Sequence, residues 1–279
     1  MMKGKFTIFT SVLLLVGFYS LRADNPAANG PRIKFVLVGD STVTDNAGWG
    51  LGFKQFLTEG AVCINTAQNG RSSESFRREG RWTNALALKD DYYLIQFGHN
   101  NEPGKPGRST DMPTFVSNIV SYVEEARAIG AKPVLVTPLT RRQWDQEHPG
   151  KIKSSLAPYA EAVRKIAAEK QVPLVDLQAR SIELCEAIGP ERCLEFSPPK
   201  MVDGTNTGGF DRTHLNTKGH VLFARLVVEE LHKVTPELRS VLRTEPAGAI
   251  PDEEGLVGPM IENICYANAK FYLAFPGVM

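Results

Sequence analysis

Residues 33–42 of this chain read IKFVLVGDST, an apolar and largely β-branched run that passes directly into a glycine, an acid and two hydroxyl side chains. A run of this kind is typical of a strand that is buried on both faces of a sheet. Open α/β sheets bind their ligands beyond the carboxyl ends of their strands, and Ser41 follows such an end. Ser41 is therefore the candidate nucleophile, although Gly-Asp-Ser is also an ordinary turn composition.

Similar apolar runs recur along the chain and alternate with segments of helical period. Strands that alternate with helices imply right-handed crossovers and a parallel sheet that is covered on both faces. We therefore predict an α/β fold, a three-layer α/β/α sandwich of the flavodoxin-like kind with a five-stranded parallel sheet. The expected strands are Ile33–Val38, Val62–Asn65, Tyr92–Phe97, Pro133–Thr137 and Pro173–Leu177, and the expected helices are Phe115–Ile129, Pro158–Lys170 and Lys218–Leu231.

The helix expected at Phe115–Ile129 has signals at both of its ends. Asp111 can cap the first turn, and Pro113 suits that turn because its missing N–H needs no partner there. Gly130 follows the last periodic residue and is a typical helix stop.

The first 23 residues resemble a secretory signal peptide. Lys3 and Lys5 precede the apolar run Phe6–Tyr19, and cleavage is expected near Ala23. We therefore predict export, either to the periplasm or out of the cell. A retained signal anchor is the alternative, but the run is short for a membrane span. No cysteine follows the run directly, which argues against a lipoprotein anchor.

The composition is that of an ordinary globular protein. The chain has 279 residues, of which 42% are hydrophobic and 23% charged. Loss of the signal peptide leaves 29 basic and 31 acidic residues, a balance that does not indicate nucleic acid as a partner. We expect a signal peptide at residues 1–23, a catalytic domain at 30–236, and a C-terminal extension at 237–279, where the periodic pattern degrades.

Four cysteines are scattered along the chain without the close pairing of zinc or thioredoxin-like sites. In an exported protein they could form two disulfides, with three possible pairings. We favour a bridge between Cys185 and Cys193, because a turn at Gly189 could bring them together. Free buried thiols are the alternative. The other two cysteines are Cys63 and Cys265.

Groups suited to acyl transfer follow the strands in order. Ester cleavage through a serine needs a base, a group that orients the base, and donors for the developing oxyanion. Gly70 after the second strand can present a backbone N–H, and Asn100 after the third can present an amide. Asp211 lies three residues before His214, a spacing that lets the carboxylate hold Nδ1 while Nε2 takes the serine proton.

These blocks resemble those of the SGNH (GDSL-type) hydrolase superfamily, and within it their sequences are more similar still to rhamnogalacturonan acetylesterases. The resemblance spans roughly residues 33–232 and implies the SGNH hydrolase fold and a serine esterase acting on acetylated pectic polysaccharide. The long block from Arg71 to Trp82 is much more specific than the nucleophile motif. The similar blocks are Gly39–Thr42, Gly48–Gly50, Asn69–Ser73, Ser75–Trp82, Phe97–Asn100 and Thr213–His214, followed by Gly219.

The resemblance also implies residue roles. Ser41, Asp211 and His214 would form the catalytic triad, and the N–H groups of Ser41 and Gly70 with the Asn100 amide would form the oxyanion hole. The chain departs from the family's pattern at Asn101, where aspartate is usual, and at Arg212, where a second histidine is common. Both departures weaken the assignment of the substrate more than that of the reaction.

Substrate contacts are less well marked. Trp49 and Trp82 could stack on sugar rings, although tryptophans are core residues at least as often. Arg71, beside the oxyanion glycine, could pair with a uronate carboxylate. His99 could form a hydrogen bond that supports the site from behind the residues that touch the substrate. No histidine pair has metal-ligand spacing supported by a carboxylate, so we expect neither a metal nor another cofactor.

The absence of other motifs argues against several other enzyme classes. Val43 stands where an α/β-hydrolase elbow has glycine, and no Walker-type loop is present. An SGNH esterase acting on acetylated xylan, a lipid or a thioester stays possible, as does a carbohydrate-binding protein that keeps the fold without turnover. An intact triad favours an enzyme, because a binding protein gains nothing from it.

Overall fold

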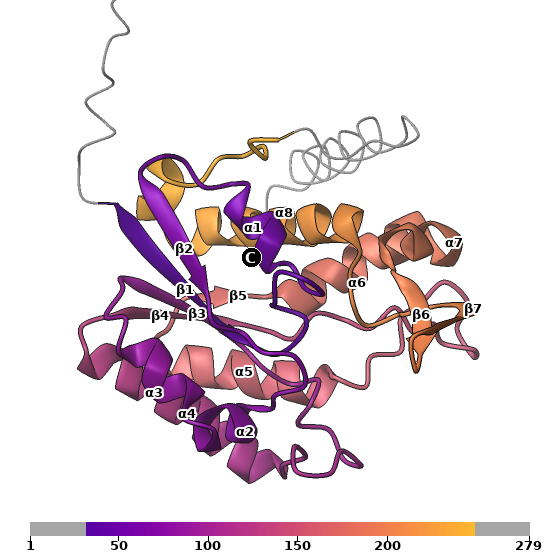
Figure 1. Ribbon diagram of the computed structural model, residues 1–279, viewed down its shortest axis with the longest axis horizontal. Coiled ribbons are helices and arrows are strands. Elements are labelled where there is room, and N and C mark those ends of the chain that lie inside the picture. The colour runs from indigo at the N-terminus through magenta and orange to yellow at the C-terminus, as the bar shows by residue number, and fades with distance from the viewer. Residues whose placement is uncertain (1–31, 249–279) are drawn as a thin grey trace, which may run out of the picture.

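The computed structural model describes residues 32–248 of the chain, so the predicted signal peptide, Cys265 and residues 249–279 lie outside the described part. Five parallel strands form one sheet in the order β2-β1-β3-β4-β5, as Figure 1 shows. The α/β architecture and the predicted sheet are confirmed. The strands are β1 (Ile33–Gly39), β2 (Ala61–Asn65), β3 (Tyr92–Gln96), β4 (Lys132–Val136) and β5 (Leu174–Val175).

The inner strand β1, which lies between β2 and β3, is buried because both faces of the sheet are covered. Phe35 and Leu37 belong to one hydrophobic cluster, and Val36 and Val38 belong to the other. Alternate residues of a strand point to opposite faces, so a continuous apolar run supplies two cores at once. This explains why β1 reads as an unbroken apolar run rather than as an alternation of apolar and polar residues.

Helices form the two outer layers of the sandwich. Figure 1 shows α1, α6 and α8 on one face of the sheet and α2 to α5 on the other. The predicted helix cap is present, because the Asp111 side chain accepts a hydrogen bond of 2.8 Å from the Thr114 N–H. The helices are α1 (Gly50–Lys54), α2 (Ser73–Arg78), α3 (Arg81–Leu86), α4 (Met112–Ala128), α5 (Ala157–Lys170), α6 (Leu177–Ile188), α7 (Pro190–Cys193) and α8 (Thr217–Val234), with short 3₁₀ turns η2 (Leu194–Phe196) and η3 (Pro236–Ser240).

An antiparallel hairpin, which the sequence analysis did not anticipate, precedes the loop to α8. It consists of β6 (Pro199–Val202) and β7 (Thr205–Phe210), and it projects from the sandwich beside α7 and α6 (Figure 1). Met201 and Phe210 are exposed by 56% and 47%. Because the hairpin ends one residue before Asp211, it sets the approach of the chain to the final helix.

The described beginning of the predicted C-terminal extension packs against the domain. Leu238 and Leu242 are buried, and Arg225 of α8 pairs with Glu245 at 2.5 Å. Within residues 32–248, no helix has both the length and the apolar character that crossing a membrane would require.

The favoured disulfide is not formed in the structure. Cys185 and Cys193 are both buried free thiols, and Cys193 Sγ donates a hydrogen bond of 3.6 Å to the carbonyl of Cys185. The turn at Gly189 does bring the two residues together, because α6 and α7 meet there.

Candidate active site

His214 lies between a hydroxyl and a carboxylate that come from distant parts of the chain. Its Nε2 is 2.8 Å from Ser41 Oγ, and its Nδ1 is 2.7 Å from Asp211 Oδ2. Ser41 follows β1, whereas the other two residues precede α8, so they meet at the carboxyl edge of the sheet. In this arrangement the imidazole can take the serine proton while the carboxylate holds its tautomer.

The Asp211 carboxylate is held in its ionised form. Burial alone would raise its pKa, but hydrogen bonds from the His214 side chain and from the backbone N–H groups of His214 and Thr213 hold the pKa well below its usual range. Those N–H groups donate to Oδ1 at 3.1 and 2.8 Å, while Oδ2 accepts from the imidazole. The Asp211 carboxylate is therefore ionised when His214 takes up a proton, and its negative charge stabilises the imidazolium.

The turn that carries Ser41 is fixed by a series of buried hydrogen bonds. Asp40 Oδ1 accepts from the Thr42 N–H at 2.9 Å and from the Thr42 hydroxyl at 2.8 Å. Gln96 Nε2 donates to that hydroxyl oxygen at 2.6 Å, and Trp49 Nε1 donates to Gln96 Oε1 at 3.0 Å. Because each donor is committed to a partner, the position of Ser41 is set by the strands β1 and β3 beneath it.

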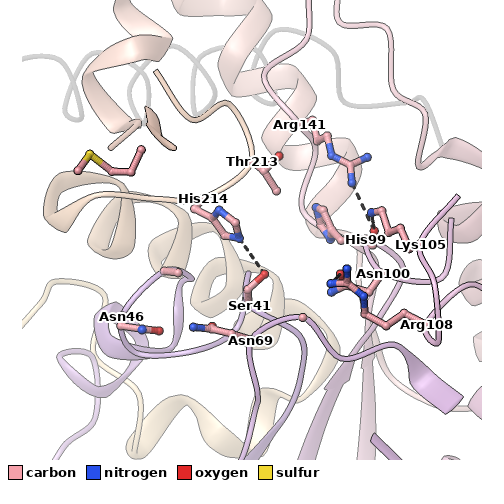
Figure 2. A pocket seen from close by; sticks show the side chains of 13 residues that line it. Ser41, Asn46, Asn69, His99, Asn100, Lys105, Arg108, Arg141, Thr213 and His214 are labelled. Carbon is pink, nitrogen blue, oxygen red and sulfur yellow. Dashed lines mark hydrogen bonds between the residues drawn. The ribbon is translucent and has the colours of Figure 1, made fainter. Parts of the chain in front are cut away.

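Gly70 and Asn100 line the same pocket as Ser41. Figure 2 shows Asn100 across this pocket from His214. Gly70 has φ +72°, a conformation that side chains rarely tolerate, and a Cβ added there would lie 3.2 Å from Arg108 Nη1. Asn100 Nδ2 donates to the Arg71 carbonyl at 3.2 Å, and Asn100 Oδ1 lies 3.4 Å from Arg108 Nη1. The amide nitrogen carries two hydrogens, so one is left for an oxyanion.

The loop that carries Asp211 and His214 rests on a buried arginine that the sequence analysis did not single out as a site residue. Arg142 is fully buried; its Nη2 donates to the carbonyls of Asp211, at 3.1 Å, and of His214, and its Nε donates to Ser197 Oγ at 3.0 Å. Burial lowers the pKa of Arg142. No spacing or motif marks this residue, because its role arises only where the segment after β4 meets the loop before α8.

Two predicted substrate contacts are corrected by the structure. Trp49 is 0% exposed and supports the Ser41 turn, as described above. Trp82 is 3% exposed, packs on Tyr122 and donates its indole N–H to Glu125 at 2.6 Å. Neither ring is free to stack on a sugar, because apolar packing and a hydrogen-bond partner hold both of them inside the domain.

Of the other two predicted substrate contacts, His99 lines the Ser41 pocket and Arg71 does not. Arg71 Nε is 3.0 Å from Glu79, and Arg71 is not among the residues that line the Ser41 pocket. His99 does line the pocket, is 2% exposed, and has its Nδ1 3.6 Å from Asp40 Oδ2. Burial raises the pKa of Asp40, but attraction to His99 and hydrogen bonds from Thr42 outweigh it, so the pKa is lowered.

The pocket around Ser41 continues into a neighbouring groove. The pocket has a volume of about 830 Å³ and the groove about 620 Å³, and both are lined by Met201 and Thr213. Phe210 and Lys200 also line the groove. The hairpin therefore separates two parts of a cleft that is larger than an acetyl group needs.

One surface group in the described part of the chain has donor atoms close enough to hold a metal ion. It consists of Asp145, Glu147 and His148, whose ligand atoms lie within 4.8 Å of one another. The Asp145 carboxylate accepts a hydrogen bond from the Glu147 N–H and contacts His148 Nδ1, and none of the three residues lines the Ser41 pocket. This cluster gives no reason to assign a metal to the reaction.

The chain is similar in sequence to several known proteins. A model of the GDSL-like lipase/acylhydrolase family matches residues 37–222. A rhamnogalacturonan acetylesterase of Bacillus subtilis is 37% identical over 227 residues, which cover 75% of this chain and 94% of the relative. A rhamnogalacturonan acetylesterase of Emericella nidulans is 28% identical over 218 residues, with coverages of 67% and 80%.

Solved structures show the same fold. The Bacillus subtilis protein YXIM is 27% identical and superimposes with a TM-score of 0.62 over 73% of this chain, which spans 57% of that longer protein. An acetylxylan esterase of Geobacillus stearothermophilus has a TM-score of 0.55 at 20% identity, covering 72% of this chain and 95% of that one. At that identity the likeness concerns the fold alone.

Proposed function

The chain belongs to the GDSL-like lipase/acylhydrolase family, and on that basis we propose that it is a serine esterase that removes acetyl groups from an acetylated pectic polysaccharide of the rhamnogalacturonan type. The observation that carries the proposal is the continuous series of hydrogen bonds from Ser41 through His214 to Asp211. The named relatives support the acetyl group and the polysaccharide.

The geometry supports a two-step mechanism. Ser41 Oγ attacks the acetyl carbonyl as His214 Nε2 takes its proton, and the negative charge that develops on the carbonyl oxygen faces the N–H groups of Ser41 and Gly70 and the Asn100 amide. The imidazolium then gives its proton to the leaving sugar oxygen. This leaves an acetyl group on Ser41.

Water completes the cycle by the same route in reverse. His214 takes a proton from water as the water oxygen attacks the acetyl-enzyme, and collapse of the second tetrahedral intermediate releases acetate and restores the Ser41 hydroxyl. Asp211 stays ionised in both steps and stabilises the imidazolium each time it forms. The residues therefore suffice for the chemistry without another reactive group.

Export to the periplasm or to the medium forms part of the proposal. It is supported only by the sequence of residues 1–23, which lie outside the described part of the chain.

The direct test is acetate release from acetylated rhamnogalacturonan, with acetylated xylan and a long-chain ester as comparison substrates. We expect the rhamnogalacturonan to be preferred, and we expect Ser41→Ala to abolish release while the protein stays folded. Hydrolysis of p-nitrophenyl acetate by both proteins serves as the check on the nucleophile. Equal rates for the two proteins would remove Ser41 from the mechanism, and preference for the long-chain ester would replace the acetylesterase with a lipase-like activity.

A further inference from the structure

The pocket beside Ser41 is lined by three cationic side chains and by no carboxylate of residues 32–248. The cations are Lys105, Arg108 and Arg141, and Figure 2 shows them on the side of Ser41 opposite His214. An acetyl group is neutral and needs no positive charge for recognition. Positive charge that no protein carboxylate neutralises is therefore available to the transition state or to another part of the substrate.

Only part of this charge is neutralised within the described part of the protein. Glu102, which does not line the pocket, pairs with Arg141 at 2.6 Å and with Lys105 at 3.1 Å. Burial raises the pKa of Glu102, but hydrogen bonds from Arg141, Ser155 and Lys105, and the charge of Arg141, outweigh it and lower the pKa to about 2. Glu102 is thus ionised near neutral pH, and one carboxylate for three cations leaves two positive charges.

Arg108 is the cation that is least committed. Its guanidinium contacts Asn100 Oδ1 at 3.4 Å, and no carboxylate among residues 32–248 pairs with it. In contrast, Arg71, which the sequence analysis favoured for this role, is held by Glu79 at 3.0 Å. A guanidinium has five donors in a planar fork that matches a carboxylate, so most of the binding capacity of Arg108 is unused.

We propose that Arg108, assisted by the charge of Lys105, binds the carboxylate of a uronic acid residue in the substrate. This proposal rests on the proposed function and adds the part of the substrate that is recognised. Arg108 Nη1 lies beside both Gly70 and Asn100, which are expected to hold the acetyl carbonyl. The bound carboxylate therefore belongs to the sugar that carries the acetyl group or to the sugar next to it.

The test uses one acetylated oligosaccharide in two forms, with its uronate carboxyls free and with the same carboxyls methyl-esterified. For the wild type, we expect a lower KM for the free acid, and we expect this preference to shrink at high salt because added ions screen the attraction. Arg108→Gln should raise the KM for the free acid at least about tenfold more than for the methyl ester, as expected when a charge-assisted hydrogen bond is lost. Arg108→Lys should keep part of the preference, because it keeps the charge but loses the fork.

A matched control variant is available at the opposite edge of the sheet. Arg127, at the end of α4, is exposed and lies near the first residues of β3 and β4, so Arg127→Gln removes the same charge far from Ser41. It should leave the preference for the free acid unchanged. A similar loss of preference in both variants would show that net charge, and not the Arg108 subsite, favours the acid.

A second outcome would also overturn the subsite. If Arg108→Gln lowers kcat equally on the free acid, the methyl ester and p-nitrophenyl acetate, Arg108 acts by holding the Asn100 amide for the oxyanion and does not read the substrate carboxylate. An unchanged KM for the free acid would likewise refute the proposal.

Inhibition separates failure of the subsite from failure of the proposed function. Digalacturonate should inhibit p-nitrophenyl acetate hydrolysis by the wild type more strongly than its methyl ester does, and Arg108→Gln should raise the inhibition constant of digalacturonate about tenfold. This measurement does not require that the enzyme deacetylate a polysaccharide. A wild type that releases no acetate from either oligosaccharide but is inhibited in this way would retain the subsite and lose the proposed function.

Discussion

Trp49 helps to fix the position of the Ser41 nucleophile through a series of hydrogen bonds and without contacting it directly. Its indole N–H holds Gln96, Gln96 donates to the Thr42 hydroxyl, and Thr42 donates to Asp40 on the other side of Ser41. The same residue type on a surface would offer a platform for a sugar ring. At 0% exposure it offers a hydrogen bond instead, and its effect on activity is indirect.

Replacing Trp49 with phenylalanine should therefore lower stability and leave substrate binding unaltered. The change leaves Gln96 Oε1 without its donor, and a buried unpaired polar group costs about 1–3 kcal/mol, to which the smaller ring adds a cavity. The measurements are the free energy of unfolding by denaturant and the KM for an acetylated oligosaccharide. A raised KM with unchanged stability would restore Trp49 as a substrate contact.

Arg142 should act on turnover through the residues it holds. Arg142→Met removes the donors to the carbonyls of Asp211 and His214, so we expect kcat to fall by about tenfold to a hundredfold while KM changes little, as for a loss confined to the transition state. Arg142→Lys, which keeps a cationic donor, should recover part of kcat. If Arg142→Met lowers only the melting temperature, and kcat of the folded fraction is normal, the residue has a purely structural role.

At the scale of elements, the site is built from strand ends and one irregular approach to α8. The turns after β1, β2 and β3 supply Ser41, Gly70 and Asn100, because parallel strands end at the same edge. The histidine and aspartate instead come from the loop after the β6–β7 hairpin. That hairpin presents exposed apolar side chains beside the catalytic pocket and the adjoining groove.

The hairpin should contribute to binding of long substrates only. The double variant Met201→Ala and Phe210→Ala removes the exposed apolar surface, so we expect the KM for a polymeric substrate to rise about threefold to tenfold, equivalent to about 1 kcal/mol of lost apolar contact. The rate with p-nitrophenyl acetate, which is too small to span the cleft, is the comparison. A proportional loss with both substrates would mean that the hairpin instead positions Asp211.

At the scale of the whole molecule, several carboxylates are more acidic in the folded state than in the unfolded chain. Burial alone would raise the pKa of these carboxylates, but attraction to a nearby cationic or histidine side chain and hydrogen bonds outweigh burial, so each pKa is lowered. The pairs are Asp40 with His99, Glu102 with Arg141, Asp176 with Arg164, and Asp211 with His214. In acid the unfolded chain then binds more protons than the folded chain. The stability that these groups contribute is present above a pH of about 4 and is lost as the pH falls through their folded pKa values.

We therefore expect the melting temperature to fall steeply below about pH 4. For Glu102, whose folded pKa is about 2, the loss should extend down to that value. Glu102→Gln cannot take up this proton, so its melting temperature should depend less steeply on pH between about 4 and 2. Parallel curves for the variant and the wild type would exclude Glu102 as a source of the acid sensitivity.

The amino-acid sequence by itself determined the α/β class, the five strands and the Asp111 cap. A strand that is buried on both faces reads as a continuous apolar run, and a helix end is marked by its capping residue, so both leave local patterns in the sequence. It also singled out Ser41, Asp211 and His214, since strand ends and three-residue spacing are local properties. Only the tertiary structure decided that Trp49 and Trp82 are buried in the core. It also decided that Arg142 holds the loop of Asp211 and His214 and that no carboxylate of the described residues pairs with Arg108. These features depend on which side chains meet across segments distant in sequence, and neither residue type nor spacing distinguishes a buried tryptophan from an exposed one or a paired arginine from an unpaired one.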